Sequence, residues 1–164
     1  MNEAQAKLVY RPADLLALAR TLWGEARSEG KPGMIAVAWV IRNRLARPGW
    51  WSRQQGDGIP DDTVEAVCRD PAQFSCWWDA QASKVRSRSV EALGLAWPVA
   101  LAVLEGDEPD PTGGADHYHT VARPAGVREW PPAWAKGQRG VTIGRHVFYR
   151  LGLSGRGERQ GKSG

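Results

Sequence analysis

LLALARTLWGEARSEGKPGMIAVAWVIRNR, residues 15–44, is the stretch that decides the fold. Pro12 suits the first position of a helix because proline has no backbone N–H to lose. Gly30 and Pro32 end that helix, and the apolar run after them predicts a second helix over residues 34–45. Because this run is apolar nearly all round, we expect it to form the buried centre of the fold. The first helix places these apolar residues on one face: Leu15, Leu18, Ala19, Leu22 and Ala26.

Glu25 lies on the flank of that apolar face, near the end of the first predicted helix. Its carboxylate is therefore expected where the apolar stripe meets solvent or a cleft. Burial disfavours the charged form of a carboxyl group, so a glutamate in such a place can serve as a general acid. Glu29, four residues further on, shares that side of the helix. The alternative for Glu25 is a solvated surface glutamate in the last turn.

The run LARTLWGEARSEG (residues 18–30), followed by residues 36–38 and 41–44, resembles the opening of the SleB/CwlJ-type cell wall hydrolases. Those proteins degrade the glycan strands of peptidoglycan, and the first glutamate of their Gly-Glu-Ala-Arg motif is the catalytic acid. The resemblance implies that Glu25 is the catalytic residue. It also implies a mainly helical α+β fold, a single lysozyme-like domain over residues 8–151 with a small antiparallel sheet near the cleft.

The segment QFSCW (residues 73–77) is similar to one that lies beside the cleft in that family. By this analogy Gln73 and Ser75 bind N-acetyl or hydroxyl groups, and Trp77 stacks on a sugar ring. The alternative is that Phe74 and Trp77 belong to the core and that Gln73 caps a turn, since buried aromatic residues are usually structural.

The segment DPTGGA (residues 110–115) is also similar to the family, where aromatic residues at the far wall of the cleft follow it. A short strand is expected here, and alternation puts His117 and His119 on one face of it and Asp116 and Tyr118 on the other. Together with Glu29, the following residues are expected to contact the substrate: Asp116, His117, Tyr118 and His119.

Weaker patterns predict the other elements. A capping-box pattern predicts a short helix over residues 62–69. Residues 79–88 are polar and basic and are expected to form a loop or an exposed turn. Residues 89–105 predict a helix with a break or a fresh start at Pro98. Residues 141–150 predict a hairpin, and their IGRHVFY matches the family's Ile-Gly-x-His-x-Phe-Tyr close.

The reaction that the resemblance implies is cleavage of the bond between N-acetylmuramic acid and N-acetylglucosamine, largely as a lytic transglycosylase. In that mechanism one carboxylate, Glu25, serves both proton-transfer steps. A hydrolase would normally need a second carboxylate. Glu29, Asp79 and Asp116 are the candidates, and the sequence does not rank them.

Two other enzyme classes compete with this interpretation. His117, His119 and His146 are the three histidines of the chain and could form the zinc site of an amidase or peptidase. No His-Glu-x-x-His motif is present, so we expect no metal and no other cofactor. Cys76 could be the nucleophile of a Cys/His amidase, but its neighbours supply no base that would lower its pKa. Cys68 and Cys76 are expected to be reduced structural thiols.

The composition bounds the partners. The chain has 164 residues, enough for one domain, and its 22 Lys and Arg residues outnumber 18 acidic ones, so the surface should attract polyanions. Nine tryptophans suit sugar rings as well as bases. Trp50 and Trp51, in a predicted loop, either line a groove or cover the edge of the core. The non-enzyme alternative is a nucleic-acid-binding module, but the basic residues are spread out. We therefore expect peptidoglycan glycan strands as the partner and no specific nucleic acid.

Neither end of the sequence indicates a membrane segment. Residues 1–7 are polar and do not resemble a signal peptide, and no run is long enough to span a membrane. We therefore expect a monomer made in the cytoplasm that reaches the cell wall by phage-type release or virion delivery, as an endolysin does. Residues 152–164 have too little apolar content to fold and are expected to form a disordered basic tail.

Overall fold

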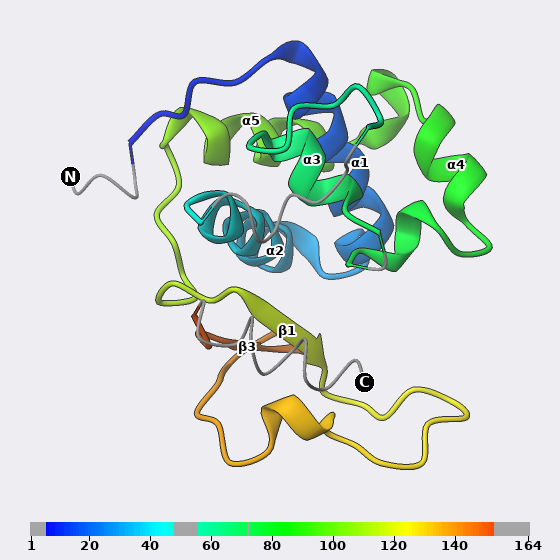
Figure 1. Ribbon diagram of the computed structural model, residues 1–164, viewed down its shortest axis with the longest axis vertical. Coiled ribbons are helices and arrows are strands. Elements are labelled where there is room, and N and C mark those ends of the chain that lie inside the picture. Colours follow the sequence, from blue (N-terminus) through cyan, green and yellow to red (C-terminus); the bar gives the residue numbers. More distant parts are fainter. Residues whose placement is uncertain (1–5, 48–55, 72, 153–164) are drawn as a thin grey trace.

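The structure is a computed structural model that describes residues 6–47, 56–71 and 73–152. Helices α1 to α5 gather on one side of the molecule, and a small sheet lies on the other (Figure 1). This arrangement confirms the predicted mainly helical α+β domain with a small antiparallel sheet. The elements are α1 (Pro12–Ala26), α2 (Gly30–Leu45), α3 (Val64–Arg69), η2 (Ser75–Trp77), α4 (Ala82–Ser87), η3 (Val90–Leu93), α5 (Ala96–Glu105), β1 (His117–Thr120), η4 (Ala133–Ala135), β2 (Val141–Ile143) and β3 (His146–Tyr149).

Helices α1 and α2 form the centre of the core. The apolar face of α1 is buried as its spacing predicts, and α2 is buried on every side from Gly33 to Ile41. Helix α2 begins at Gly30 instead of residue 34, and Pro32 lies in its first turn, where the missing N–H leaves no helical hydrogen bond unmade. The short link between the two helices leaves Glu25 and Glu29 close to the same edge of the helical layer.

The sheet has three strands in the order β1-β3-β2, and both pairs are antiparallel. The predicted hairpin is confirmed by β2 and β3, with Gly144 at the turn in a left-handed conformation (φ 59°). In the β1–β3 pair Tyr118 lies opposite Phe148, and Phe148 is buried in the same core as the helices. Burial of Phe148 is thus one contact that fixes the sheet against the helices.

Gly24 lets the η2 turn approach α1 closely. A Cβ atom at this position would lie 2.5 Å from Cβ of Cys76 and 2.7 Å from its Sγ. A larger residue would therefore push η2 away from the helix. Cys76 and Cys68 are both buried, as expected for structural cysteines, and their reduced state stays a prediction.

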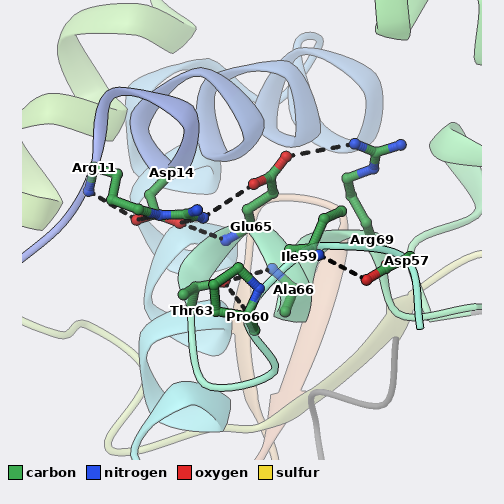
Figure 2. A network of polar contacts seen from close by, with 9 residues as sticks. All are labelled: Arg11, Asp14, Asp57, Ile59, Pro60, Thr63, Glu65, Ala66 and Arg69. Carbon is green, nitrogen blue, oxygen red and sulfur yellow. Dashed lines mark hydrogen bonds and ion pairs between the residues drawn. The ribbon is translucent and has the colours of Figure 1, made fainter. Parts of the chain in front are cut away.

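Figure 2 shows the polar network that joins the start of α1 to α3. The side chain of Asp14 is only 4% exposed, and its carboxylate accepts hydrogen bonds from the backbone N–H groups of Arg11 (2.8 Å) and Glu65 (2.9 Å). The Arg11 guanidinium donates to both Asp14 (3.0 Å) and Glu65 (3.0 Å). This network fixes α3 across the beginning of α1.

The predicted short helix over residues 62–69 is confirmed as α3. Its first turn is capped by the Thr63 side chain, which accepts a hydrogen bond from the backbone N–H of Ala66 at 3.1 Å. The predicted loop over residues 79–88 is wrong, because α4 forms there. The polar sequence gave no sign of a helix, because Val85 is the one buried residue of α4 and one apolar residue shows no periodicity.

The interrupted helix predicted over residues 89–105 forms as two elements, η3 and α5. Pro98 lies in the first turn of α5, so the fresh start that proline indicated is confirmed. Gly106 ends α5 in a left-handed conformation (φ 80°), as glycine commonly does after a helix.

The fold continues one residue into the predicted tail. The backbone N–H of Gly152 donates to Oδ2 of Asp116 at 2.8 Å. Residues 153–164, and the pair Trp50 and Trp51, lie outside the residues that the structure describes. Within the described ranges no helix is both long and apolar enough to cross a membrane.

Replacing Asp14 with Asn is expected to lower the free energy of unfolding by about 2 kcal/mol near neutral pH, because buried donors lose a charged acceptor. Burial alone would raise the pKa of Asp14, but hydrogen bonds from Arg11 and Glu65 outweigh burial and lower it. A lowered folded-state pKa contributes stability that is present above the unfolded value, roughly 4, and is lost as the pH falls through the folded value. The difference between variant and wild type should therefore shrink below about pH 4.

Urea unfolding between neutral pH and about pH 2.5 checks this expectation. Asp107→Asn, at an exposed position, serves as the control and should match the wild type throughout. A difference between Asp14→Asn and wild type that stays constant over this range would show that the Asp14 charge does not stabilise the fold.

Gly24→Ala is expected to destabilise the fold by about 1–3 kcal/mol, since the new methyl group would overlap Cys76. Cys76→Gly removes the two nearest atoms that this methyl group would meet. The double variant should therefore lose less stability than the sum of the two single variants, which a double-mutant cycle measured by urea unfolding would show. Strictly additive losses would mean that the close approach of η2 to α1 does not depend on Gly24.

Candidate active site

Glu25 stands at the end of α1, and its carboxylate accepts hydrogen bonds from two other parts of the fold. The hydroxyl of Tyr118 in β1 donates to Oε1 at 2.7 Å. The backbone N–H of Cys76 in η2 donates to Oε2 at 3.1 Å. Each carboxylate oxygen therefore has a donor from a different element, and together the donors fix the orientation of the group.

Glu25 lines a cleft with a volume of about 510 Å³. Among the residues that the structure describes, Glu25 is the sole carboxylate in this lining. Three parts of the fold each contribute four lining residues. The helical side contributes Gly24, Glu25, Ser75 and Gln81, and the sheet contributes Tyr118, His119, Thr120 and His146. The segment after β1 contributes Pro124, Trp130, Pro132 and Trp134.

Two ring side chains of the sheet stand next to Glu25. Burial raises the pKa of Tyr118, and the charge of Glu25 and the hydrogen bond to it raise that pKa further, so the hydroxyl remains a donor. The ring of His146 meets the ring of Tyr118 edge-on, with centroids 5.0 Å apart. Burial lowers the pKa of His146, which keeps its imidazole neutral near pH 7.

Glu29 anchors the hairpin to the helices. Its side chain is 5% exposed, and its two oxygens accept hydrogen bonds from the backbone N–H and from Nε of Arg145, both at 2.8 Å. Burial alone would raise the pKa of Glu29, but the Arg145 hydrogen bonds outweigh burial and lower it. Glu29 was expected to bind substrate. It does not line the cleft, and its bonds to Arg145 give it a structural task instead.

Trp77 and Gln73 were expected to bind substrate, but the structure places both away from the cleft. Trp77 is 3% exposed, and its Nε1 donates to Oγ1 of Thr21 at 2.8 Å, so its ring cannot stack on a sugar. The core alternative for Trp77 is the correct one. Gln73 accepts a hydrogen bond from Arg44 of α2 at 3.2 Å. Ser75, between them in sequence, is exposed and lines the cleft, and its contact with substrate stays a prediction.

Asp116 was also expected to contact substrate, and this is wrong because the residue is fully buried. Its carboxylate lies 2.8 Å from Nδ1 of His117 and accepts hydrogen bonds from the backbone N–H groups of Leu151 and Gly152. It therefore ties the end of the fold to β1. His117 does not line the cleft either, whereas His119 does.

The three histidines do not converge on one point. As alternation predicts, His117 and His119 share one face of β1, and their rings lie 5.1 Å and 5.7 Å from the ring of Trp134. His146 instead packs against Tyr118, on the other face of the sheet. This arrangement opposes a zinc site built from these histidines. The Cys76 alternative also fails, since burial raises the pKa of that thiol and keeps it unreactive.

Several residues of the cleft were not among those expected there. Gln81 reaches it from the turn before α4, in the stretch that was predicted to be a loop. Trp130 and Trp134 reach it from the long irregular segment between β1 and β2. The sequence EWPPAW (residues 129–134) carries a signal in its paired aromatic and proline residues, which are unusual for an exposed connector.

Comparisons with known proteins identify the family of this chain. The chain matches the family described as Cell Wall Hydrolase over residues 28–149, most of its length, and Glu25 lies just before the matched segment. A spore cortex-lytic enzyme from Halalkalibacterium halodurans is 30% identical over 139 residues, which cover 85% of this chain and 35% of that protein. One from Oceanobacillus iheyensis is 28% identical, with 85% and 42% covered. The chain thus spans less than half the length of either relative.

Two solved structures are similar in fold. The catalytic domain of the germination-specific lytic transglycosylase SleB from Bacillus anthracis is 27% identical, with a TM-score of 0.57, and the match covers 86% of this chain and 97% of that one. The SleB catalytic domain from Bacillus cereus is 24% identical, with a TM-score of 0.56 and 91% and 98% covered. These likenesses confirm the predicted lysozyme-like fold.

The relatives correct one expectation and settle the family. They are spore cortex-lytic enzymes and a germination-specific enzyme, not phage endolysins, so the expected phage-type release or virion delivery is wrong. The matched range includes three of the segments that first pointed to the cell wall, QFSCW, DPTGGA and IGRHVFY. The chain belongs to the cell wall hydrolase family.

Proposed function

We propose that this chain cleaves the bond between N-acetylmuramic acid and N-acetylglucosamine in peptidoglycan as a lytic transglycosylase, with Glu25 as catalytic acid and base. The observation that carries the proposal is that Glu25 is the sole carboxylate among the described residues of the cleft lining. The SleB domain from Bacillus anthracis, whose fold is similar, is described as a lytic transglycosylase. The proposed reaction uses no cofactor. A monomeric state and the lack of a specific nucleic-acid partner stay predictions from the sequence.

A second carboxylate, which hydrolysis would normally require, has no good candidate in the described cleft. Glu29 directs its oxygens to Arg145, and Asp116 is fully buried. Asp79 does not line the cleft, and its Oδ1 accepts a hydrogen bond from the backbone N–H of Gln81 at 2.9 Å. The simplest nucleophile is therefore a hydroxyl group of the substrate itself.

In the first step Glu25 donates its proton to the glycosidic oxygen. The bond between that oxygen and C1 of N-acetylmuramic acid breaks, and the N-acetylglucosamine leaves with the proton on its new hydroxyl group. Positive charge develops at C1 while Glu25 becomes a carboxylate. The hydroxyl of Tyr118 and the backbone N–H of Cys76 are already placed to stabilise this carboxylate.

In the second step the C6 hydroxyl of the same muramic acid attacks C1. A new C–O bond closes the 1,6-anhydro ring, and the proton of that hydroxyl returns to Glu25. No water is consumed, and Glu25 ends in the state in which it began. One carboxylate can therefore perform both proton transfers, and the product differs from that of hydrolysis by one water.

Glu25→Gln is expected to reduce the rate of peptidoglycan lysis by roughly two to four orders of magnitude, because it keeps the shape of the side chain but removes the transferable proton. Its melting temperature should stay close to that of the wild type. Glu91→Gln, at an exposed position of η3 outside the cleft, is the matched control and should lyse at the wild-type rate. The rate at which a suspension of purified peptidoglycan loses turbidity measures the lytic activity of both variants. A lysis rate near that of the wild type in Glu25→Gln would contradict the assignment of Glu25 as the catalytic acid.

The digest of purified sacculi is expected to contain muropeptides ending in 1,6-anhydro-N-acetylmuramic acid, since the C6 hydroxyl is the proposed nucleophile. Mass spectrometry distinguishes them, because each is lighter by one water than the hydrolysis product. If reducing ends predominate instead, a water-activating group exists, and Asp79, the one accessible candidate, should be mutated first.

A further inference from the structure

The segment after β1 forms a wall of the cleft that consists largely of rings. Pro124, Trp130, Pro132 and Trp134 line the cleft from this segment. Figure 1 shows the segment and η4 on the side of the sheet away from the helices. Glu25, Ser75 and Gln81 of the helical side line the same cleft. We call Trp130 and Trp134, with the two prolines, the aromatic wall.

The rings of the aromatic wall are held in place. Trp134 meets His117, His119 and Tyr149 with ring centroids 5.1, 5.7 and 5.6 Å apart. The Nε1 of Trp130 donates to the backbone carbonyl of Thr120 at 3.0 Å, and its ring meets His119 at 5.3 Å. These ring contacts are tilted or edge-on, and both tryptophans remain partly exposed to the cleft. A ligand that stacks on them would therefore find surfaces that are already ordered, which lowers the entropic cost of binding.

A cleft that is lined by both aromatic rings and polar side chains fits one class of ligand. A pyranose ring has a face of C–H groups, which packs on aromatic surfaces, and a rim of hydroxyl groups, which needs hydrogen-bonding partners. Ser75 and Gln81 offer such partners beside Glu25. An anionic stem peptide would instead need cations, and the described lining contains no Lys or Arg.

We infer that Trp130 and Trp134 form a saccharide subsite, which holds a pyranose ring of the glycan strand by stacking beside the bond that Glu25 cleaves. The inference rests on the proposed function for the identity of the strand. The binding it describes can nevertheless be measured without cleavage. The two tryptophans hold the sugar and take no part in proton transfer.

The test measures the affinity of Glu25→Gln protein for glycan strands freed of their stem peptides. Adding Trp134→Ala or Trp130→Ala is expected to weaken this binding about five- to tenfold, as loss of one aromatic contact would. Trp78→Ala is the matched control, because Trp78 is 45% exposed, lies beside Arg86 and does not line the cleft. Trp134→Phe keeps an aromatic face and should retain most of the affinity, which preserves the test if the alanine variant fails to fold.

In the active enzyme the same tryptophan substitutions should raise KM about five- to tenfold and change kcat little. If the Trp130→Ala and Trp134→Ala variants keep the wild-type affinity and KM, the subsite is wrong. It is also wrong if these variants bind free stem peptides more weakly but bind stripped glycan as before. The proposed function fails separately, if Glu25→Gln protein remains active, and that result leaves the binding measurement to decide the subsite.

Discussion

The carboxylate of Glu25 is the point at which three distant parts of the chain meet. Its two hydrogen-bond donors lie 51 and 93 residues further along the sequence, one in η2 and one in β1. Each bond requires its element to pack closely against the end of α1. Gly24 permits this for η2, since no side chain occupies the space that Cys76 fills. The position of the sheet is likewise constrained, because the Tyr118 hydroxyl must reach Oε1.

Glu29 constrains the sheet at the turn of the β2–β3 hairpin. Its bonds to Arg145 hold the β2–β3 hairpin, and Gly144 leaves room for them, because a Cβ there would lie 2.6 Å from Oε1 of Glu29. Two glutamates from one short motif therefore have different tasks. Glu25 faces the cleft, and Glu29 fixes the wall that bears Tyr118 and His146. Spacing along a helix places both on the same side but cannot distinguish these tasks, which depend on the hairpin far away in sequence.

Sequence patterns predicted those elements whose formation depends on residues that are close together in the sequence. The apolar faces of α1 and α2, the short helix α3, the fresh start at Pro98 and the turn at Gly144 each follow from a few adjacent residues. Helix α4 could not be found in this way, since a single buried valine stabilises a short helix only through tertiary packing. The same limit applies to the site. Trp77 and Asp116 were placed at the cleft by family analogy, yet burial is decided by contacts with Thr21 and with residues 151–152.

The wall that carries Trp130 and Trp134 has little regular structure, so no periodicity could have revealed it. Contacts with the rings of His119 and Tyr149, and a hydrogen bond to the backbone carbonyl of Thr120, hold it to a sheet of short strands. The helices, by contrast, share a continuous apolar core, which Phe148 of the sheet also enters. An active site assembled from both layers is only as long-lived as the less stable of them. Brief opening of the sheet would separate Tyr118 from Glu25 while the helices stayed folded, so the temperature limit of catalysis and that of the fold are separate quantities.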